Sequence, residues 1–385
     1  MLHNIPTEPR RPNSAQPRPA QSRPSPVRET SYIKPLPKKK SGPSMGTVFV
    51  LCAVLLVSLT VLVCMFAALN YRNDMIAELE GEYAALSSQN ESLKVELSRA
   101  EETVAAIYEP IFEHASRIEE TKTITGIRSE YAILIDLQNN TVIADKNGDR
   151  RIYPASMTKM MTLIVAAEHI SDYDELFTFS YAITDPAYQA GASVAGFLSS
   201  ESVPLIDIMY GVALPSGADA TTALAITIAG SEEAFAELMN KKAVEMGLER
   251  THFMNASGLH HDDHYSTPHE MAIILEYAMK IPLLAEILST YQYRTTKTPQ
   301  HPDGILLTST MFSRMYGDEA GNCEVIAGKT GYTHEARQCL ASMAETPDGR
   351  RFVLVTAMAQ EKYDPIWDAI DIYKNYIPAI EEVAQ

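Results

Sequence analysis

Two short strings in this chain hold the residue types that acyl transfer requires. Residues 156–159 are Ser-Met-Thr-Lys, and residues 329–331 are Lys-Thr-Gly. Residues three apart at a helix start have Cβ atoms about 5–6 Å apart, so Lys159 could take the proton of the Ser156 hydroxyl and free its oxygen to attack a carbonyl carbon. Because a lysine is a base only when neutral, the pKa of Lys159 must be lowered by burial or by a second cation such as Lys329.

Each string has a sequence context that suits this chemistry. An apolar stretch at 160–167 follows Ser156 and predicts a buried helix, and Val-Ile-Ala-Gly at 325–328 predicts a strand that leads into Lys329. A second Ser-x-x-Lys, at 31–34, lies in a proline-rich tail. The spacing alone is therefore common, and the two strings together indicate a site.

The elements that must position these strings follow an α+β order. Apolar runs bounded by turn residues predict strands at 131–137, 141–144, 325–332, 339–344 and 351–359. Helices are expected at 367–376 and directly after four residues, Ser156, Pro204, Gly217 and Ser231. Strands at both ends with helices between them predict one α+β domain over residues 127–385.

The N-terminal part differs in charge and hydropathy. Residues 1–45 hold nine Lys or Arg and two Asp or Glu, whereas the whole chain has a formal net charge of −17. The 22 uncharged residues from Val48 to Leu69 are enough to cross a bilayer. We therefore expect a disordered, basic, Pro-rich tail at 1–47 and a transmembrane helix at 48–70.

The same pattern predicts an orientation. Positive charge stays on the cytoplasmic side of a membrane, so the N-terminus should be cytoplasmic and the domain from 127 onward extracytoplasmic. A cleaved signal peptide is the alternative, but such a peptide usually has a shorter apolar region and a small-residue cleavage site. The acidic remainder of the chain argues against a nucleic-acid partner.

A heptad pattern follows the apolar run. Its positions are Ile76, Leu79, Tyr83, Leu86, Asn90, Leu93, Leu97 and Ala100. A buried Asn90 at such a position often fixes the register of a dimer. We expect a coiled-coil stalk at 71–110, a possible homodimer through it, and a linker at 111–126. The alternative is a single amphipathic helix that lies on the external domain.

Four stretches of residues 125–375 resemble, in the same order, the D-alanyl-D-alanine carboxypeptidases of the low-molecular-mass penicillin-binding protein class. They are Tyr-Pro-Ala-Ser-Met-Thr-Lys at 153–159, Leu-Pro-Ser-Gly-Ala-Asp-Ala at 214–220, Asn-Ala-Ser-Gly-Leu at 255–259 and Gly-Lys-Thr-Gly-Tyr-Thr at 328–333. The resemblance implies the β-lactamase/penicillin-binding-protein-like transpeptidase fold, an antiparallel sheet with a helical cluster. It also implies that β-lactams are covalent inhibitors.

Carried over position by position, the resemblance implies a role for each matched residue. Ser156 would be the nucleophile, Lys159 its base, and Ser216 a proton relay to the leaving amine. The backbone N–H groups of Ser156 and Tyr332 would form the oxyanion hole. The substrate would be a peptidoglycan stem peptide ending in D-Ala-D-Ala, with no metal ion and no cofactor. The residues implied to bind this peptide are Lys329, Thr330 and Gly331.

Three positions depart from the family pattern. Ala218 stands where the family has an asparagine. Residues 335–337 are Glu-Ala-Arg where Ala-Gly is common. The segment 360–369 lacks the arginine that assists carboxylate binding in relatives, which leaves Lys362 or Arg337 as substitutes.

Two other enzyme classes match parts of the sequence. A class A serine β-lactamase shares the outer strings but needs a Glu-x-x-x-Asn element, which residues 257–270 lack. A zinc peptidase would use the cluster at 260–264, where His260 and His264 have helix-like spacing. Glycine and proline on either side of that cluster favour a solvated loop instead.

A non-enzymatic interpretation is also open. Without the asparagine at position 218, the domain could be a weakly active or inactive penicillin-binding scaffold that binds peptidoglycan and partner proteins. Because the serine, lysine and threonine positions of the site are all occupied, we expect a membrane-anchored serine carboxypeptidase. It would remove the terminal D-Ala of stem peptides through an acyl-enzyme on Ser156.

Overall fold

The structure, a computed structural model, describes residues 45–107, 114–315 and 320–378. The predicted cytoplasmic tail lies almost entirely outside these residues, as do positions 111–113 of the predicted linker. The chain divides into two units, residues 1–92 and 93–385, and each is described by itself.

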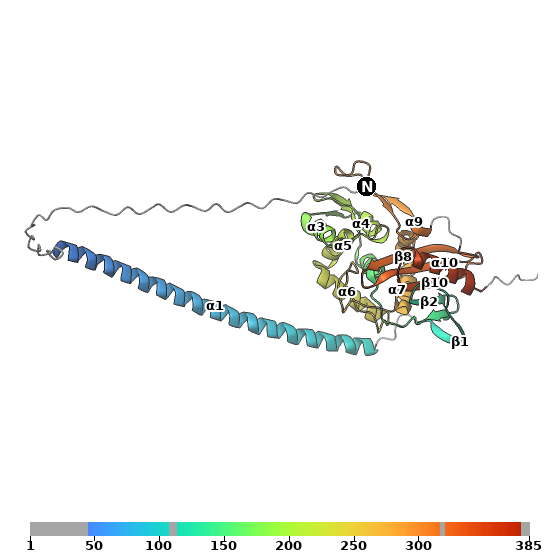
Figure 1. Cartoon of the computed structure of the whole chain (residues 1–385), viewed down its shortest axis with the longest axis horizontal. Coiled ribbons are helices and arrows are strands. Elements are labelled where there is room, and N and C mark those ends of the chain that lie inside the picture. Colours follow the sequence, from blue (N-terminus) through green and yellow to red (C-terminus); the bar gives the residue numbers. More distant parts are fainter. Residues whose placement is uncertain (1–44, 108–113, 316–319, 379–385) are drawn as a thin grey trace, which may run out of the picture. The chain divides into compact units, whose positions relative to one another are not determined.

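A single helix makes up the described part of the first unit. Helix α1, Met45–Ile107, is continuous for 63 residues (Figure 1). Within it, Phe49–Glu96 contains a stretch long and apolar enough to cross a membrane, and none of that stretch is buried. The helix is therefore compatible with a single-pass anchor. The predicted heptad lies farther along α1, and the coiled coil stays a prediction.

A six-stranded sheet is the frame of the second unit, with the order β1-β3-β2-β10-β9-β8. Strand β1 runs parallel to β3, and every other neighbouring pair is antiparallel. The strands are Ser116–Thr123 (β1), Tyr131–Asp136 (β2), Thr141–Lys146 (β3), Glu324–Thr333 (β8), Arg337–Glu345 (β9) and Arg351–Ala359 (β10). The five strands predicted from the sequence are thus confirmed.

The central strands are apolar on both faces, so both faces need cover. In β2, Ile133 belongs to one core and Leu134 to another, and in β10 Val353 and Leu354 divide in the same way. This period-2 alternation of two apolar sets is what a strand buried between two layers requires. The sheet therefore lies between two helical layers.

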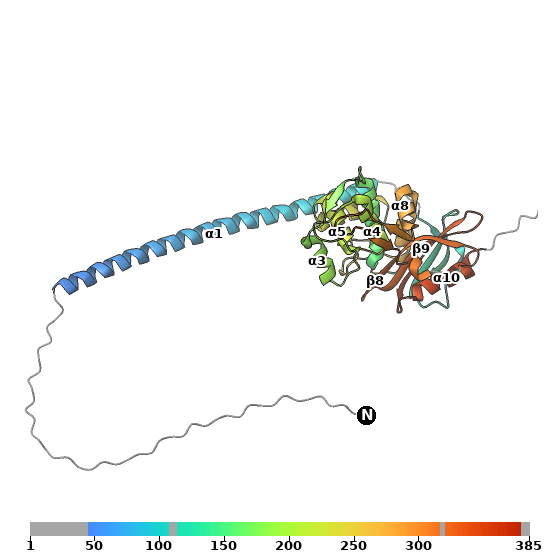
Figure 2. The same ribbon diagram turned by 90° about the horizontal axis from the view of Figure 1, so that it is seen from above.

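One layer is small and the other large. Helix α10, Asp364–Tyr376, packs on β9 and β10 together with α9, Phe312–Met315. In Figure 2, α3, α4 and α5 lie on the other side of β8 and β9 from α10. The helices of the large layer are Lys159–His169 (α2), Tyr181–Gln189 (α3), Leu205–Ala213 (α4), Ala218–Ala229 (α5), Glu232–Glu245 (α6), Pro268–Lys280 (α7) and Pro282–Leu288 (α8).

Helix α2 lies inside the large layer, where it contacts α4, α5, α6, α7 and α8. Residues Lys159 to Ala166 are all buried, as expected for a helix that is apolar on all sides. The four helices and the terminal helix predicted from the sequence are confirmed. Two short hairpins complete the unit: Leu176–Thr178 (β4) with Ser202–Pro204 (β5), and Gln292–Arg294 (β6) with Leu306–Thr308 (β7).

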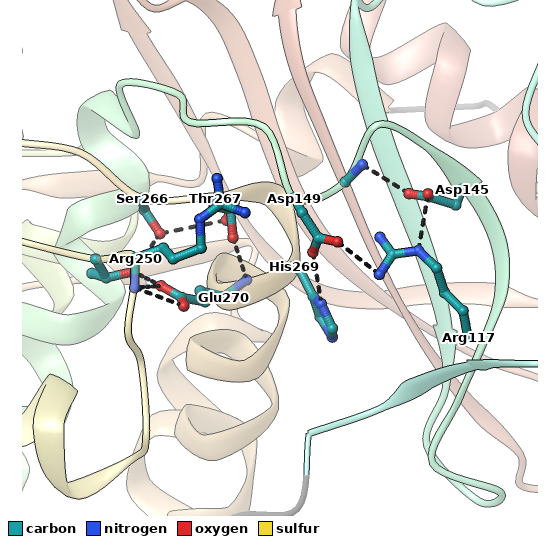
Figure 3. Close-up of polar contacts among 10 residues, drawn as sticks. Arg117, Asp145, Asp149, Arg250, Ser266, Thr267, His269 and Glu270 are labelled. Carbon is teal, nitrogen blue, oxygen red and sulfur yellow. Dashed lines mark hydrogen bonds and ion pairs between the residues drawn. The ribbon is translucent and has the colours of Figure 1, made fainter. Parts of the chain in front are cut away.

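Strand β1 corrects the predicted linker at 111–126, because residues 116–123 pair with β3. Its sequence, Ser-Arg-Ile-Glu-Glu-Thr-Lys-Thr, has no apolar alternation that could predict a strand. Polar contacts hold it instead (Figure 3). Arg117 forms ion pairs with Asp145 at 3.1 Å and Asp149 at 2.8 Å, and Asp149 also contacts His269 Nδ1 at 3.1 Å. His269 is in the first turn of α7, so these contacts join β1 to α7, a helix that packs on the sheet.

Candidate active site

Ser156 lies in a short 3₁₀ helix, Ala155–Thr158 (η1), that leads directly into α2. Ala155, just before it, has a positive φ of 47°, a conformation that non-glycine residues rarely adopt. The Ala155 carbonyl packs against Gly258, where an added Cβ would lie 1.9 Å from that oxygen. The turn that presents Ser156 therefore depends on the absence of a side chain at position 258.

The structure brings Lys159 and Ser156 together as the sequence predicted. Lys159 Nζ lies 3.1 Å from Ser156 Oγ and donates a second hydrogen bond, of 2.5 Å, to the carbonyl oxygen of Ser257. Lys159 is 2% exposed. Burial lowers its pKa to about 7, against the opposite effect of the Asp219 and Glu232 carboxylates. Near neutral pH a large fraction of this amine is thus unprotonated and able to accept a proton.

The second string lies on β8, which runs beside η1. An added Cβ on Gly331 would lie 2.8 Å from the Pro154 carbonyl oxygen and 3.2 Å from the Ser156 backbone nitrogen. The backbone at 331–332 is therefore close to the Ser156 N–H, the arrangement that the predicted oxyanion hole requires. Thr330 Oγ1 hydrogen-bonds Thr310 Oγ1 at 2.7 Å.

Lys329 is the most enclosed residue of this string. It is 1% exposed, and its Nζ donates to the Thr330 carbonyl oxygen at 3.1 Å. Burial lowers its pKa well below the ordinary value, and the charges of Lys159 and Arg314 add to that effect. The sequence offered burial or Lys329 as the cause of a lowered pKa at Lys159, and in the structure burial is the cause.

Ser216 occupies the loop before α5 with a positive φ of 69°. Its hydroxyl oxygen is buried and has no hydrogen-bond partner among the residues that the structure describes. Buried hydroxyl groups are normally paired. Since Ser216 borders a cavity, its hydroxyl is placed to bond a ligand or a water there.

A cavity of about 540 Å³ brings the predicted residues together. Ser156, Lys159, Ser216, Thr330, Gly331 and Tyr332 all line it, whereas Lys329 lies behind its surface. The site thus combines a hydroxyl with an adjacent base, a second free hydroxyl, and a strand edge for an extended peptide. These are the parts that acyl transfer needs.

Comparison with known proteins agrees with this geometry. The family model described as D-alanyl-D-alanine carboxypeptidase, of the S11 peptidases, matches residues 118–361. The chain belongs to this family. Its S11 relatives include the D-alanyl-D-alanine carboxypeptidase DacF of Bacillus subtilis, 31% identical over 231 residues, which cover 60% of this chain and 58% of that protein. DacA of Escherichia coli is 35% identical over 158 residues, 39% of each chain.

Solved structures of S11-like enzymes show the same fold. The crystal structure of the Streptomyces K15 DD-transpeptidase is 27% identical, with a TM-score of 0.59 over 66% of this chain and 98% of that one. The predicted penicillin-binding-protein-like α+β fold is therefore confirmed. This S11 chain spans less than two thirds of the length of the DacF and DacA proteins.

The departure at Ala218 lies inside this S11 site. Ala218 is 4% exposed, lines the cavity, and donates its backbone N–H to the Ser193 carbonyl oxygen at 2.8 Å. The next residue, Asp219, turns away and accepts hydrogen bonds from the N–H groups of Ala195 at 2.8 Å and Gly196 at 3.1 Å. Asp219 thus fixes the neighbouring loop and supplies no polar group at position 218.

The two predicted substitutes for the family arginine differ in position. Arg337 pairs with Glu130 at 2.7 Å and is not among the residues that line the cavity. Lys362 does line the cavity. Arg314, which no motif in the sequence indicated, lines it as well. The segment that carries Arg314 meets β8 through the hydroxyl contact between Thr310 and Thr330, which links residues 20 apart in the chain.

The histidine cluster at 260–264 is divided between surface and core. His264 is 2% exposed, and burial lowers its pKa to about 3, so its ring is neutral. Nδ1 accepts from the Met254 N–H at 3.1 Å, so Nε2 carries the hydrogen and donates to Thr158 Oγ1 at 2.8 Å. His264 thus links η1, through Thr158, to the backbone at Met254, which is a structural role.

Proposed function

We propose that this protein is a membrane-anchored serine-type carboxypeptidase. It removes the terminal D-Ala of peptidoglycan stem peptides through an acyl-enzyme on Ser156. The observation that carries the proposal is the contact of 3.1 Å between Lys159 Nζ and Ser156 Oγ, made by a buried amine whose pKa is about 7. A hydroxyl beside a neutral amine is a nucleophile paired with its base.

The reaction begins with proton transfer from Ser156 Oγ to the unprotonated Lys159 amine. Oγ bonds to the carbonyl carbon of the penultimate D-Ala, and the backbone N–H groups of Ser156 and Tyr332 hold the oxyanion that forms. The C–N bond then breaks as the proton passes through the Ser216 hydroxyl to the leaving D-Ala amine. The buried hydroxyl oxygen of Ser216 has no hydrogen-bond partner among the described residues, which supports this relay role.

Water completes the cycle. Lys159, again neutral, takes a proton from a water molecule that attacks the ester carbonyl. The ester C–O bond then breaks as Lys159 returns that proton to Ser156 Oγ, which restores the hydroxyl and the neutral amine. Burial of Lys159 favours its neutral form before each step. When a β-lactam acylates Ser156, the amine of the opened ring stays attached to the acyl group and cannot diffuse away. The acyl-enzyme should therefore persist on Ser156.

The N-terminal part suits enzyme action at a membrane surface. The apolar stretch of α1 supports a single-pass anchor, and the basic residues before it support a cytoplasmic N-terminus with the domain outside. The heptad in α1 supports a parallel homodimer. Protease added to intact cells should then remove the catalytic domain and spare the tail; protection of that domain would contradict this topology.

D-Ala release is the direct test of the activity. The full-length protein in detergent micelles is given an N-acylated tripeptide ending in D-Ala-D-Ala, and free D-Ala is measured. The wild type and Ser193→Ala, which alters another serine lining the cavity, should release D-Ala, and Ser156→Ala should not. Covalent penicillin binding without any D-Ala release would favour the alternative, an inactive penicillin-binding scaffold.

A further inference from the structure

One cation in the active-site cavity has no assigned role. Arg314, in α9, lines the cavity that also contains Ser156 and Thr330. It is half-buried, and among the described residues its side chain has neither an ion-pair partner nor a hydrogen-bond acceptor. Glu335 also lines this cavity, but among the described residues no ion pair joins it to Arg314. The guanidinium is therefore suited to bind an anion from solution.

The segment that carries Arg314 is fastened to the catalytic strands. Thr310 contacts Thr330 through their hydroxyl groups at 2.7 Å, and its backbone N–H donates to the Leu214 carbonyl oxygen at 3.0 Å. Ser309 accepts from the Phe312 N–H at 3.3 Å and so begins the short helix. The segment that carries Arg314 is therefore fixed to both β8 and the loop that contains Ser216.

Arg314 differs from the two active-site lysines in how firmly its side chain stays protonated. Lys159 and Lys329 are 2% and 1% exposed, and burial lowers the pKa of each. The charges of Lys159 and Arg314 lower the pKa of Lys329 further. A guanidinium is protonated at any pH that the protein experiences. Burial also lowers the pKa of Arg314, but the ordinary pKa of a guanidinium is so high that, of the three groups, the arginine keeps its charge most firmly.

We propose that Arg314 is a specificity-determining residue that binds the free C-terminal carboxylate of the substrate peptide. This inference rests on the proposed function and deepens it. The planar guanidinium can offer two parallel N–H donors to a carboxylate, a geometry that an ammonium group lacks. Lys329, which the family resemblance implies for substrate binding, is 1% exposed and its Nζ donates to the Thr330 carbonyl oxygen, so the half-buried Arg314 is the more accessible cation.

Two peptides that differ at one group test the inference. One is the N-acylated tripeptide ending in D-Ala-D-Ala, and the other is the same peptide with a C-terminal amide. We expect the full-length wild type to prefer the free acid. Arg314→Gln should lower kcat/KM for the acid about 10- to 100-fold, mainly through KM, and leave the amide nearly unchanged. Arg314→Lys should recover part of the preference.

Arg337→Gln is the matched control, since it removes an arginine that pairs with Glu130 away from the cavity. It should keep the wild-type preference. An equal loss on acid and amide in Arg314→Gln would indicate a structural role and overturn the inference, as would an unchanged preference. Loss of the preference in Lys362→Gln but not in Arg314→Gln would assign the site to Lys362. If Arg314→Gln does not fold, Arg314→Lys must still show a reduced preference.

These outcomes are separable from failure of the proposed function. A wild-type protein that releases D-Ala from neither peptide contradicts the carboxypeptidase activity itself. A wild type that releases D-Ala while Arg314→Gln behaves identically contradicts only the role of Arg314.

Discussion

Lys159 Nζ donates to the Ser257 carbonyl oxygen at 2.5 Å while it lies 3.1 Å from Ser156 Oγ. A neutral amine has two N–H donors and one lone pair. With one donor committed to Ser257, the lone pair can accept the proton of the Ser156 hydroxyl. The stretch at 255–259 thus orients the base as well as packing behind the nucleophile.

The first prediction concerns pH. Burial lowers the pKa of Lys159 to about 7, and the amine is active when unprotonated, which is the form above that pKa. Acylation by penicillin should therefore rise with pH through about 7 and level off above it. The measurement is the acylation rate of the full-length protein from pH 5 to 9. A rate that is constant between pH 6 and 8 would contradict Lys159 as the base.

The second prediction concerns Gly258. An added Cβ there would lie 1.9 Å from the Ala155 carbonyl oxygen. Gly258→Ala should therefore lower the free energy of unfolding by about 3 kcal/mol or more. Gly349→Ala is the matched control, because Gly349 has a similar φ of +84° and open space around it, and its cost should be about 1–2 kcal/mol. Thermal unfolding of both variants measures these losses of stability. Equal losses would show that the turn at Ala155 does not depend on a bare backbone at position 258.

The third prediction concerns Ala218. The family has an amide here that can donate to a substrate carbonyl, and loss of one such contact typically costs about 2–4 kcal/mol in the transition state. Water in the cavity can recover part of that loss. The protein should therefore be a slow carboxypeptidase, and Ala218→Asn should raise peptide turnover or penicillin acylation. If a folded Ala218→Asn protein is slower in both, the site has repacked around alanine and the missing amide does not limit the rate.

The fourth prediction concerns the stalk. A buried asparagine at a heptad position weakens a coiled coil but specifies its oligomeric state. In a 71–109 peptide, Asn90→Leu should tighten association and broaden the range of oligomers seen by analytical ultracentrifugation. Ser88→Leu, at an outward heptad position, should do neither. A peptide that stays monomeric at all workable concentrations refutes the coiled coil.

Local patterns predicted much of the fold. The apolar run after Ser156 became α2, and the strand patterns around Lys329 and at 351–359 became β8 and β10. Strand β1 was missed because Arg117 and its acidic partners hold it, and contacts between distant side chains leave no periodic pattern in the sequence.

The residues of the candidate site could likewise be predicted only in part. Ser156, Lys159 and Ser216 belong to strings with a recognisable spacing, and the structure brings them to one cavity. Arg337 was one of two candidate substitutes for the family arginine, and in the structure it begins β9 and pairs with Glu130. Arg314 lines the cavity in a segment that is fixed by contacts between residues far apart in the chain, such as the hydrogen bond of Thr310 with Thr330, and no single stretch of sequence encodes those contacts.

The proposed reaction requires Ser156 to form the covalent acyl-enzyme. The most direct measurement is mass spectrometry of the full-length protein after incubation with penicillin, followed by peptide mapping of the adduct. We predict one added penicillin mass on the peptide that contains Ser156, and none in Ser156→Ala. An adduct on another residue, or labelling that survives in Ser156→Ala, would contradict the account.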